Sequence, residues 1–283
     1  VFEGDLRNRM SLERALADCQ NLFHVAADYR LWVPDPHTMH AINVEGTRSL
    51  ITAASNAGLE HIVYTSSVAT LGLTADGTPA NEETPCSLES VIGNYKRSKF
   101  LAEQVVKQLT QELSLPLVIV NPSTPIGPGD VRPTPTGRLV VDALTERMPA
   151  YVNTGLNIAH VDDIAFGHLL ALQHGKAGER YILGGDNMTL FQILESIDEI
   201  NGLSQKRIKI PTDLMLPIAW CMEKIATLTH TEPRATQDSI RMAKKQMYFS
   251  SDKAMQQLGY QYRPAYDALK DAVNWFKENN YCH

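Results

Sequence analysis

Positive charge is not in excess in this sequence of 283 residues, since 26 Lys and Arg stand against 32 Asp and Glu. The resulting formal charge of −6 argues against a protein that binds nucleic acid or an anionic membrane through bulk charge. Cysteine is also scarce, and the spacing of the few present, without a C-x-x-C pair, argues against a disulfide framework or a zinc site. The four are Cys19, Cys86, Cys221 and Cys282. This usage is typical of a reducing compartment.

Long apolar runs are missing as well. A membrane span needs about eighteen uninterrupted apolar residues, and the nearest candidate, 214–228, is interrupted by Glu223 and Lys224. The first residues lack the basic and then apolar layout of a signal peptide. We therefore expect a soluble, cytoplasmic protein without a membrane span. The 43% of hydrophobic residues is enough for one large domain or two closely joined ones.

The order of the expected elements indicates the fold class. As far as residue 185, short β-rich runs alternate with amphipathic helical stretches, which is typical of a parallel sheet covered by helices. From about residue 189 helical patterns follow one another, with one short strand expected at 207–210. The expected strands before that point are 1–3, 22–25, 61–65, 117–120 and 181–183, and the expected helices are 11–18, 37–56 and 90–113. We predict an α/β fold with a doubly wound parallel sheet and a smaller, mostly helical domain.

Tyr95 and Lys99 lie four residues apart at the start of an expected helix, and Ser67 follows the end of an expected strand. Residues four apart share a helix face, so the Tyr95 hydroxyl and the Lys99 ammonium can point into one space. A phenol has a pKa of about 10, and a neighbouring ammonium favours the phenolate. We therefore expect Lys99 to lower the pKa of Tyr95, which exchanges a proton with a substrate oxygen that Ser67 also binds.

A Y-x-x-x-K spacing alone is weak evidence, because Tyr and Lys are common on solvated helix faces. Its context strengthens the functional interpretation. The motif follows a strand that ends in Ser66-Ser67, and that strand follows another that ends in Val25-Ala26-Ala27. Small residues at the latter position let a cofactor approach the backbone closely.

Eight short motifs occur in a fixed order along essentially the whole chain. They are Gly4-Asp5-Leu6, His24-Val25-Ala26-Ala27, Asn43-Val44-Glu45-Gly46-Thr47, Tyr64-Thr65-Ser66-Ser67, Tyr95-Lys96-Arg97-Ser98-Lys99, Asn121-Pro122-Ser123, Ile126-Gly127-Pro128-Gly129-Asp130 and His160-Val161-Asp162-Asp163. Together they resemble the NAD-dependent epimerase/dehydratase family of the extended short-chain dehydrogenase/reductase superfamily. Within this family, the motifs are most similar to those of hopanoid-associated sugar epimerases and of dihydroflavonol-reductase-like enzymes.

This resemblance implies roles for the matched residues and a Rossmann-like fold that binds NAD or NADP. The implied catalytic triad is Ser67, Tyr95 and Lys99. The implied cofactor contacts are Asp5 and Leu6 at the adenine, Ala26 and Ala27 at the ribose and phosphates, Lys99 at the nicotinamide ribose, and Asn121, Pro122 and Ser123 at the nicotinamide. Ser66 and Tyr95 are further implied cofactor contacts. No metal is implied.

Four residues are candidate substrate contacts, and some of them have alternative explanations. The four candidates are Tyr29, Asn43, Arg138 and Tyr151. Asn43 lies where the family has an asparagine in its central helix, and a polar helix kink or an ordinary buried hydrogen bond explains it as well. Arg138 and Tyr151 belong to or follow a proline-rich segment, 121–157, that leaves the sheet at the end of a strand, where open α/β sheets bind ligands. Ordinary surface residues are an equal alternative for both.

The resemblance also indicates what the sequence does not contain. The family begins with a strand, a G-x-x-G-x-x-G turn and a helix whose N-terminus holds the pyrophosphate. Gly127-Pro128-Gly129 is interrupted by proline and Gly184-Gly185 lacks a third glycine, so neither replaces that turn. The strand end that distinguishes NAD from NADP is also missing. We therefore expect an N-terminal truncation, and a fragment that binds cofactor or folds poorly.

Other conspicuous residues have simpler explanations. His37 and His40 lie three apart without a third ligand, so surface histidines are preferred to a metal site. Asp162 and Asp163 do not face one another on a helix, so capping of its N-terminus is preferred to paired carboxylate chemistry, and His160 is expected to be structural. The apolar stretch 214–228 is expected to pack as a helix, with a dimer-forming or membrane-leaning surface as the alternative.

The expected chemistry is hydride transfer between a nicotinamide cofactor and a carbinol or carbonyl carbon of a small molecule. We predict a dinucleotide-binding domain over 1–122 and 158–186, and a substrate-binding domain over 123–157 and 187–283. A sugar or sugar-nucleotide epimerase of the hopanoid-associated type is preferred, and an NADPH-dependent ketone reductase is its nearest rival. A non-catalytic dinucleotide-sensing scaffold is the alternative of another class. No nucleic-acid partner is expected, and the resemblance implies a homodimer through helices 37–56 and 90–113.

Overall fold

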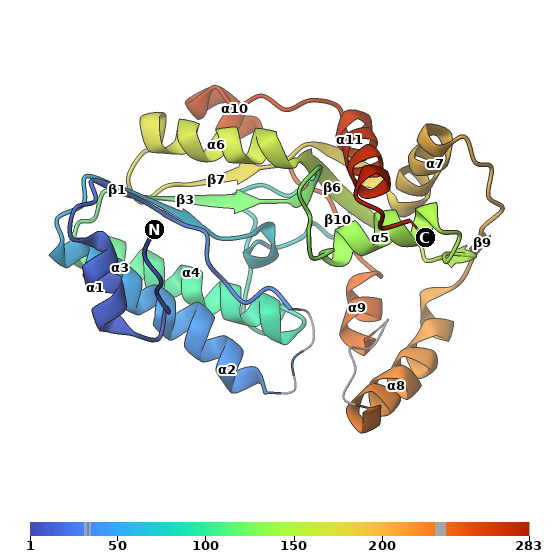
Figure 1. Cartoon of the computed structure of the whole chain (residues 1–283), viewed down its shortest axis with the longest axis horizontal. Helices are drawn as coiled ribbons and strands as arrows, with labels where there is room; N and C mark the ends of the chain where they lie inside the picture. Colours follow the sequence, from blue (N-terminus) through green and yellow to red (C-terminus); the bar gives the residue numbers. More distant parts are fainter. Residues whose placement is uncertain (31–32, 34, 230–235, 283) are drawn as a thin grey trace. The chain divides into compact units, whose positions relative to one another are not determined.

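The computed structural model describes the chain except for residues 31–32, 34, 230–235 and 283. The described chain forms two compact units (Figure 1). The first consists of Val1–Gly72, Pro85–Asn121 and His168–Tyr181, and the second of Leu73–Thr84, Pro122–Gly167 and Ile182–His283. Each unit is therefore built from several separate segments of the sequence.

The first sheet has the order β1-β2-β3-β7. Its strands are β1 (Asn21–His24), β2 (His61–Thr65), β3 (Leu117–Pro122) and β7 (Arg180–Leu183), and β1, β2 and β3 run parallel. Strand β3 is apolar and buried over most of its length, as expected for a parallel strand covered on both faces. The predicted α/β fold and these four strands are confirmed. The predicted strand at 1–3 is wrong, because no described strand pairs with these exposed residues.

Helices of the first unit cover one face of this sheet (Figure 1). They are α1 (Arg9–Leu16), α2 (Pro36–His40), the π-helical turn η1 (Ala41–Glu45), α3 (Gly46–Asn56) and α4 (Asn94–Glu112). Their apolar faces meet the strands in a core that includes Leu12, Ile51, Val106, Ile62 and Leu117. The helix predicted over 37–56 is confirmed as α2, η1 and α3 in succession. It ends near Gly58, whose φ of 69° is the left-handed conformation that glycine adopts easily.

The second unit contains a sheet that the sequence did not reveal. Strands β10 (Gln246–Met247), β6 (Gly155–His160) and β4 (Thr124–Ile126) lie in that order, and β8 (Asp186–Thr189) pairs with β6 in antiparallel fashion. A further pair joins β5 (Ala150–Tyr151) to β9 (Ile208–Lys209), the latter within the predicted strand 207–210. The proline-rich segment 121–157 thus contributes β4, β5 and part of β6 to the second unit. Pro125 makes β4 unlike a typical strand in sequence. Because β4 lies at the edge of its sheet, it can contain a proline.

Three helices and strand β6 enclose the second core. These helices are α5 (Pro135–Leu144), α7 (Leu190–Asn201) and α11 (Ala265–Glu278), and the core includes Ile158, Ile193 and Val273. The remaining helices are the short 3-10 turn η2 (Val68–Thr70), α6 (Val161–His174), α8 (Thr212–Thr229), α9 (Gln237–Met242) and α10 (Asp252–Leu258). Among the helices described, none is both long and apolar enough to cross a membrane.

Candidate active site

The start of α4 places three functional side chains on one face. Gly93 precedes the helix with a φ of 89°, a conformation that L side chains rarely adopt, and this turns the chain into the helix at Asn94. Tyr95 lies in the first turn, and Lys99 and Glu103 follow at steps of four residues, which lie one above the other on a helix. Tyr95 is half-buried, whereas Lys99 and Glu103 are only 4% and 1% exposed.

Ser67 meets the Tyr95 phenol. It follows β2 in extended conformation and caps η2, where its Oγ accepts a hydrogen bond from the Ala69 N–H at 3.1 Å. The same side chain forms a hydrogen bond with Tyr95. Because Oγ already accepts from Ala69, its own proton is available for the phenol oxygen or for a substrate oxygen. The structure thus brings together two members of the predicted triad.

The expected acidification of Tyr95 is wrong for this structure. Burial raises the pKa of the phenol above its ordinary value, and the Ser67 hydrogen bond offsets this only in part. The ammonium of Lys99 points elsewhere: its Nζ donates to the Thr65 carbonyl at 2.8 Å and lies 3.4 Å from the Tyr64 hydroxyl. A protonated phenol is therefore the resting state of Tyr95 at neutral pH.

Lys99 occupies a buried polar niche behind the strand ends. Its Nζ lies 4.9 Å from the centre of the Tyr64 ring, a cation–π arrangement. Burial lowers the pKa of the ammonium to about 8, against an opposing effect of Glu103. Burial also lowers the pKa of neighbouring His24 to about 3, so this imidazole is neutral. An ammonium has three N–H groups, and two of them have acceptors among the described residues.

Glu103 is a functional candidate that sequence reasoning missed. Its Oε2 accepts hydrogen bonds from Ser66 at 2.5 Å, Thr70 at 2.7 Å and Asn121 at 3.0 Å. Its Oε1 contacts Lys107 at 2.8 Å and Arg180 at 3.1 Å. Ser66, predicted to touch the cofactor, therefore directs its hydroxyl to Glu103. An extension of the motif to Y-x-x-x-K-x-x-x-E would have indicated this residue, because the four-residue step repeats.

Residues at and after the end of β3 carry polar atoms without partners. Asn121 is fully buried and donates through Nδ2 to the Ser67 carbonyl at 3.0 Å, while its Oδ1 has no partner among the described residues. Ser123 belongs to the second unit, where its N–H bonds to the Leu183 carbonyl, and its buried Oγ has no partner in the part of the chain that the structure describes. Buried polar groups normally have partners, so these two atoms fit residues that await a polar ligand. Pro122 between them is half-buried.

The residues predicted to flank the adenine and phosphates differ in their surroundings. The Asp5 carboxylate is exposed and pairs with Arg7 at 2.6 Å, and the Arg7 contacts lower its pKa to about 2. Leu6 packs against the first core. Ala26 is exposed and Ala27 is half-buried directly after β1, so small side chains do border the carboxyl end of this strand.

Asn43 is used within the protein. It lies in η1, is 2% exposed, and its Oδ1 accepts from the Asp28 N–H while Nδ2 donates to the Asp28 carbonyl and the Ser98 hydroxyl. This is the buried hydrogen bonding at a helix irregularity that the sequence offered as the alternative to a substrate contact. Tyr29, in the segment that Asn43 holds, is exposed.

Two further candidate substrate residues belong to the second unit. Arg138 lies on α5, where its Nε donates to the Pro133 carbonyl at 3.2 Å. Tyr151 is half-buried and its ring lies 5.4 Å from the ring of Phe191. Their role as substrate contacts stays a prediction.

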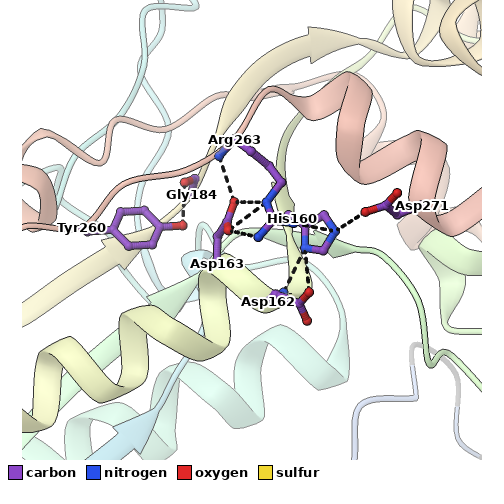
Figure 2. Close-up of polar contacts among 7 residues, drawn as sticks. All are labelled: His160, Asp162, Asp163, Gly184, Tyr260, Arg263 and Asp271. Atoms are coloured by element: carbon purple, nitrogen blue, oxygen red, sulfur yellow. Dashed lines mark hydrogen bonds and ion pairs between the residues drawn. The ribbon is translucent and has the colours of Figure 1, made fainter.

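The His160 cluster of the second unit is a structural clamp (Figure 2). His160 is fully buried; its Nδ1 accepts from the Asp162 N–H at 3.1 Å, so the ring proton is on Nε2, 3.2 Å from an oxygen of Asp271. Asp163 binds Arg263 through several hydrogen bonds, the shortest being 2.7 Å. Asp162 and Asp163 lie in the first turn of α6, as expected for acidic residues at a helix N-terminus, and Asp163 also binds Arg263, which is 100 residues away in the sequence.

Known proteins resemble the chain over its whole length. A protein from Synechocystis sp. with the provisional name dihydroflavonol 4-reductase is 45% identical over 98% of this chain and 82% of its own length. Sterol demethylase protein B from Methylococcus capsulatus is 33% identical over 97% of this chain and 84% of its own. The crystal structure of gox2253 is 52% identical, with a TM-score of 0.88 over 99% of this chain and 85% of that chain.

More distant solved structures share the fold. A nucleoside-diphosphate-sugar epimerase from Pseudomonas aeruginosa is 24% identical with a TM-score of 0.78, over 99% of this chain and 83% of its own. The sequence profile of the NAD dependent epimerase/dehydratase family matches residues 1–184. Together with the relatives above, this match identifies the chain as a member of the NAD dependent epimerase/dehydratase family, within the extended short-chain dehydrogenase/reductases.

Proposed function

We propose that the protein is an NAD(P)-dependent reductase that converts a ketone of a small, largely apolar molecule into an alcohol. The observation that carries this proposal is the hydrogen-bonded Ser67–Tyr95 pair, one helical turn from the buried ammonium of Lys99. A pair of hydroxyl groups of this kind can hold and protonate one substrate oxygen.

Reduction is favoured over sugar epimerisation for two reasons. Burial keeps Tyr95 protonated, and a ketone needs a proton donor at its oxygen, whereas oxidation of an alcohol starts from a phenolate. Further relatives at 25–29% identity include a quinoline-oxide ketoreductase, a 2-alkyl-3-oxoalkanoate reductase and a 3beta-hydroxysteroid-dehydrogenase/decarboxylase. Their names describe chemistry at a carbonyl or carbinol carbon of apolar molecules.

The matched residues fit the nicotinamide half of a cofactor. In this proposal the free N–H of Lys99 binds the ribose, the partnerless oxygens of Asn121 and Ser123 receive polar groups of the nicotinamide, and Ala26 and Ala27 border the phosphates. The cofactor supplies the hydride. We assign dinucleotide binding to the domain 1–122 with 158–186, and substrate binding to 123–157 with 187–283, where Arg138 and Tyr151 are candidate contacts.

The side chains divide the work at the carbonyl oxygen. Ser67 donates a hydrogen bond to this oxygen and fixes its position. Tyr95 delivers its proton as negative charge develops there, and the Ser67 hydroxyl stabilises the resulting phenolate. Lys99 adds positive charge one turn further along the helix. Tyr95 regains a proton from solvent before the next turnover.

The decisive variant is Tyr95→Phe, which removes the proton donor and preserves the ring. We expect turnover of a ketone panel with NADPH (a dihydroflavonol, a 3-ketosteroid and a 2-alkyl-3-oxo acid) to fall by about 10²–10⁴-fold. Cofactor binding, followed by NADPH fluorescence, should stay within about twofold, because a hydroxyl deletion leaves the other contacts in place. Tyr266→Phe, at an exposed position of α11, is the matched control.

The outcome also separates the alternatives. A Tyr95→Phe protein that turns ketones over at the wild-type rate would refute the proposal. A hopanoid-associated or other sugar epimerase uses the same triad, and it would show as isomerisation of a sugar or sugar nucleotide with no net cofactor consumption. A dinucleotide-sensing scaffold would bind NADPH and show neither activity.

A further inference from the structure

We infer that Glu103 is a positioning residue of this active site, whose buried carboxylate fixes the main chain of Ser67 and stabilises the positive charge of the Lys99 ammonium. The inference deepens the proposed function and rests on it. Glu103 contacts neither of the hydroxyl groups that would act on the substrate, and it acts through the residues that carry or flank them.

The first argument is the hydrogen bonding around Ser67. Its carbonyl oxygen receives the Thr70 hydroxyl at 2.8 Å and the Asn121 amide at 3.0 Å. The same two groups lie 2.7 and 3.0 Å from Oε2 of Glu103, and the single proton of the Thr70 hydroxyl points to one of these two acceptors at a time. The carboxylate therefore orients both side chains that hold the Ser67 peptide, and it ties the end of β2 to the middle of α4.

The cations and donors around Glu103 favour its ionised form. Ser66, Thr70 and Asn121 all approach Oε2 as donors, and Lys107 and Arg180 approach Oε1 as cations. The Asn121 amide N–H and the two cations can only donate to this carboxyl group, whereas the hydroxyl groups of Ser66 and Thr70 can donate to it or accept from it. Although burial acts to raise the pKa of Glu103, Lys107 and the hydroxyl donors outweigh it and leave the pKa below its usual value.

The second argument is charge around Lys99. The described titratable groups that face Lys99 are His24 on β1, Tyr64 on β2 and Glu103 on its own helix. His24 and Tyr64 are neutral, because burial lowers the pKa of the first and raises that of the second. Among these groups Glu103 alone is ionised near neutral pH. Its negative charge opposes the desolvation that would otherwise deprotonate the buried ammonium.

A residue that only stabilised the fold would affect unfolding and little else. The geometry instead couples Glu103 to two measurable properties of the folded enzyme, the proton affinity of Lys99 and the rate of the chemical step. Glu103→Gln tests both, because it keeps the shape and removes the charge. Glu112→Gln is the matched control, since Glu112 is exposed on the same helix.

The experiment titrates Lys99 in the folded protein by NMR of ¹³C-labelled lysine side chains, with Lys99→Arg to assign the signal. We expect the pKa of Lys99 to fall by about one unit in Glu103→Gln and to be unchanged in Glu112→Gln. With a ketone from the panel that the wild-type enzyme reduces, the kcat of Glu103→Gln should fall on the order of tenfold to a hundredfold. The reason is that a shifted Ser67 misplaces its hydrogen bond to the substrate oxygen. KM and NADPH binding should change much less.

Two further variants keep the test decisive if Glu103→Gln does not fold. Glu103→Asp keeps the charge but shortens the reach, so kcat should fall while the titration of Lys99 is retained. Thr70→Val removes one link to Ser67 and should act in the same direction. Folded Glu103 variants with wild-type kcat and an unmoved Lys99 pKa would overturn the inference. Loss of the proposed function itself would appear separately, as a Tyr95→Phe enzyme that remains active.

Discussion

At the scale of the residue, Lys99 shows how burial and pairing compete. Its ammonium is 4% exposed and is held by a carbonyl, a phenol and an aromatic face. These contacts do not fully replace water, and the pKa of the group is lowered to about 8. A cation that loses its proton more easily in the folded protein than in the unfolded chain destabilises the fold whenever it is charged.

This produces a defined dependence of stability on pH. Between about pH 8 and 10.5 the unfolded chain binds the Lys99 proton and the folded protein does not, so the free energy of unfolding should rise with pH across this window. Lys99→Met should lack that rise. The difference between the two proteins, measured by urea unfolding at several pH values, should change by a few kcal/mol at most. Parallel profiles of the two proteins would contradict the assignment.

Only part of this site could be predicted from the sequence, because the direction of a long side chain depends on contacts with other elements. Ser67 and Tyr95 could be paired from the sequence because a strand end and a helix start fix their positions through the backbone. The direction of Lys99 could not, since a long flexible chain takes its direction from Tyr64 and Thr65 on another element. Glu103 was missed because a charged residue on a helix is expected to be solvent-exposed, and only tertiary packing shows that this one is buried.

At the scale of the element, sequence patterns predicted strands correctly where hydrophobic burial alone determines the structure. Strands β2 and β3 are apolar runs buried by helices, so their limits were nearly correct. Strand β6, which contains Asn157 and begins at Gly155, was missed. The side chain of Asn157 bonds to three distant groups, including the Gly185 carbonyl at 2.7 Å, and no local pattern encodes such a contact.

Helix α7 offers a test of local stabilisation. Thr189 caps its N-terminus in a capping box, with its side chain accepting from the Gln192 N–H and the Gln192 side chain reaching back. Thr189→Ala should lower the free energy of unfolding by about 0.5–2 kcal/mol, because the Gln192 N–H loses its side-chain acceptor. Glu195→Ala, exposed on the same helix, should change it by less than about 0.5 kcal/mol. Equal denaturation midpoints for the two variants would count against the cap.

At the scale of the whole molecule, two separate cores support the two units. The core of the first unit gathers around α3, α4 and the parallel strands, and that of the second around α5, α7 and α11. Each core contains fully buried isoleucines, Ile51 in the first and Ile193 in the second. Truncation of such a side chain removes apolar burial and leaves a cavity.

The cores should respond independently to damage. Ile193→Ala and Ile51→Ala should each cost about 2–5 kcal/mol of stability. In native-state hydrogen exchange, Ile193→Ala should accelerate exchange in α7 and α11 and leave α3 largely protected, and Ile51→Ala should do the reverse. If each substitution accelerated exchange equally in both units, the two cores would have to unfold as one.

The segmental make-up of the units has a consequence for synthesis and for engineering. The chain crosses from one unit to the other at residues 72, 84, 121, 167 and 181, so neither unit is a single stretch. During translation the first unit lacks a piece until residue 181 has left the ribosome, and the second waits for α11 near the C-terminus. Cleavage of the chain at one position therefore separates neither unit from the other. Recombination that exchanged one contiguous half of the sequence between relatives would combine core residues of two different proteins within one unit.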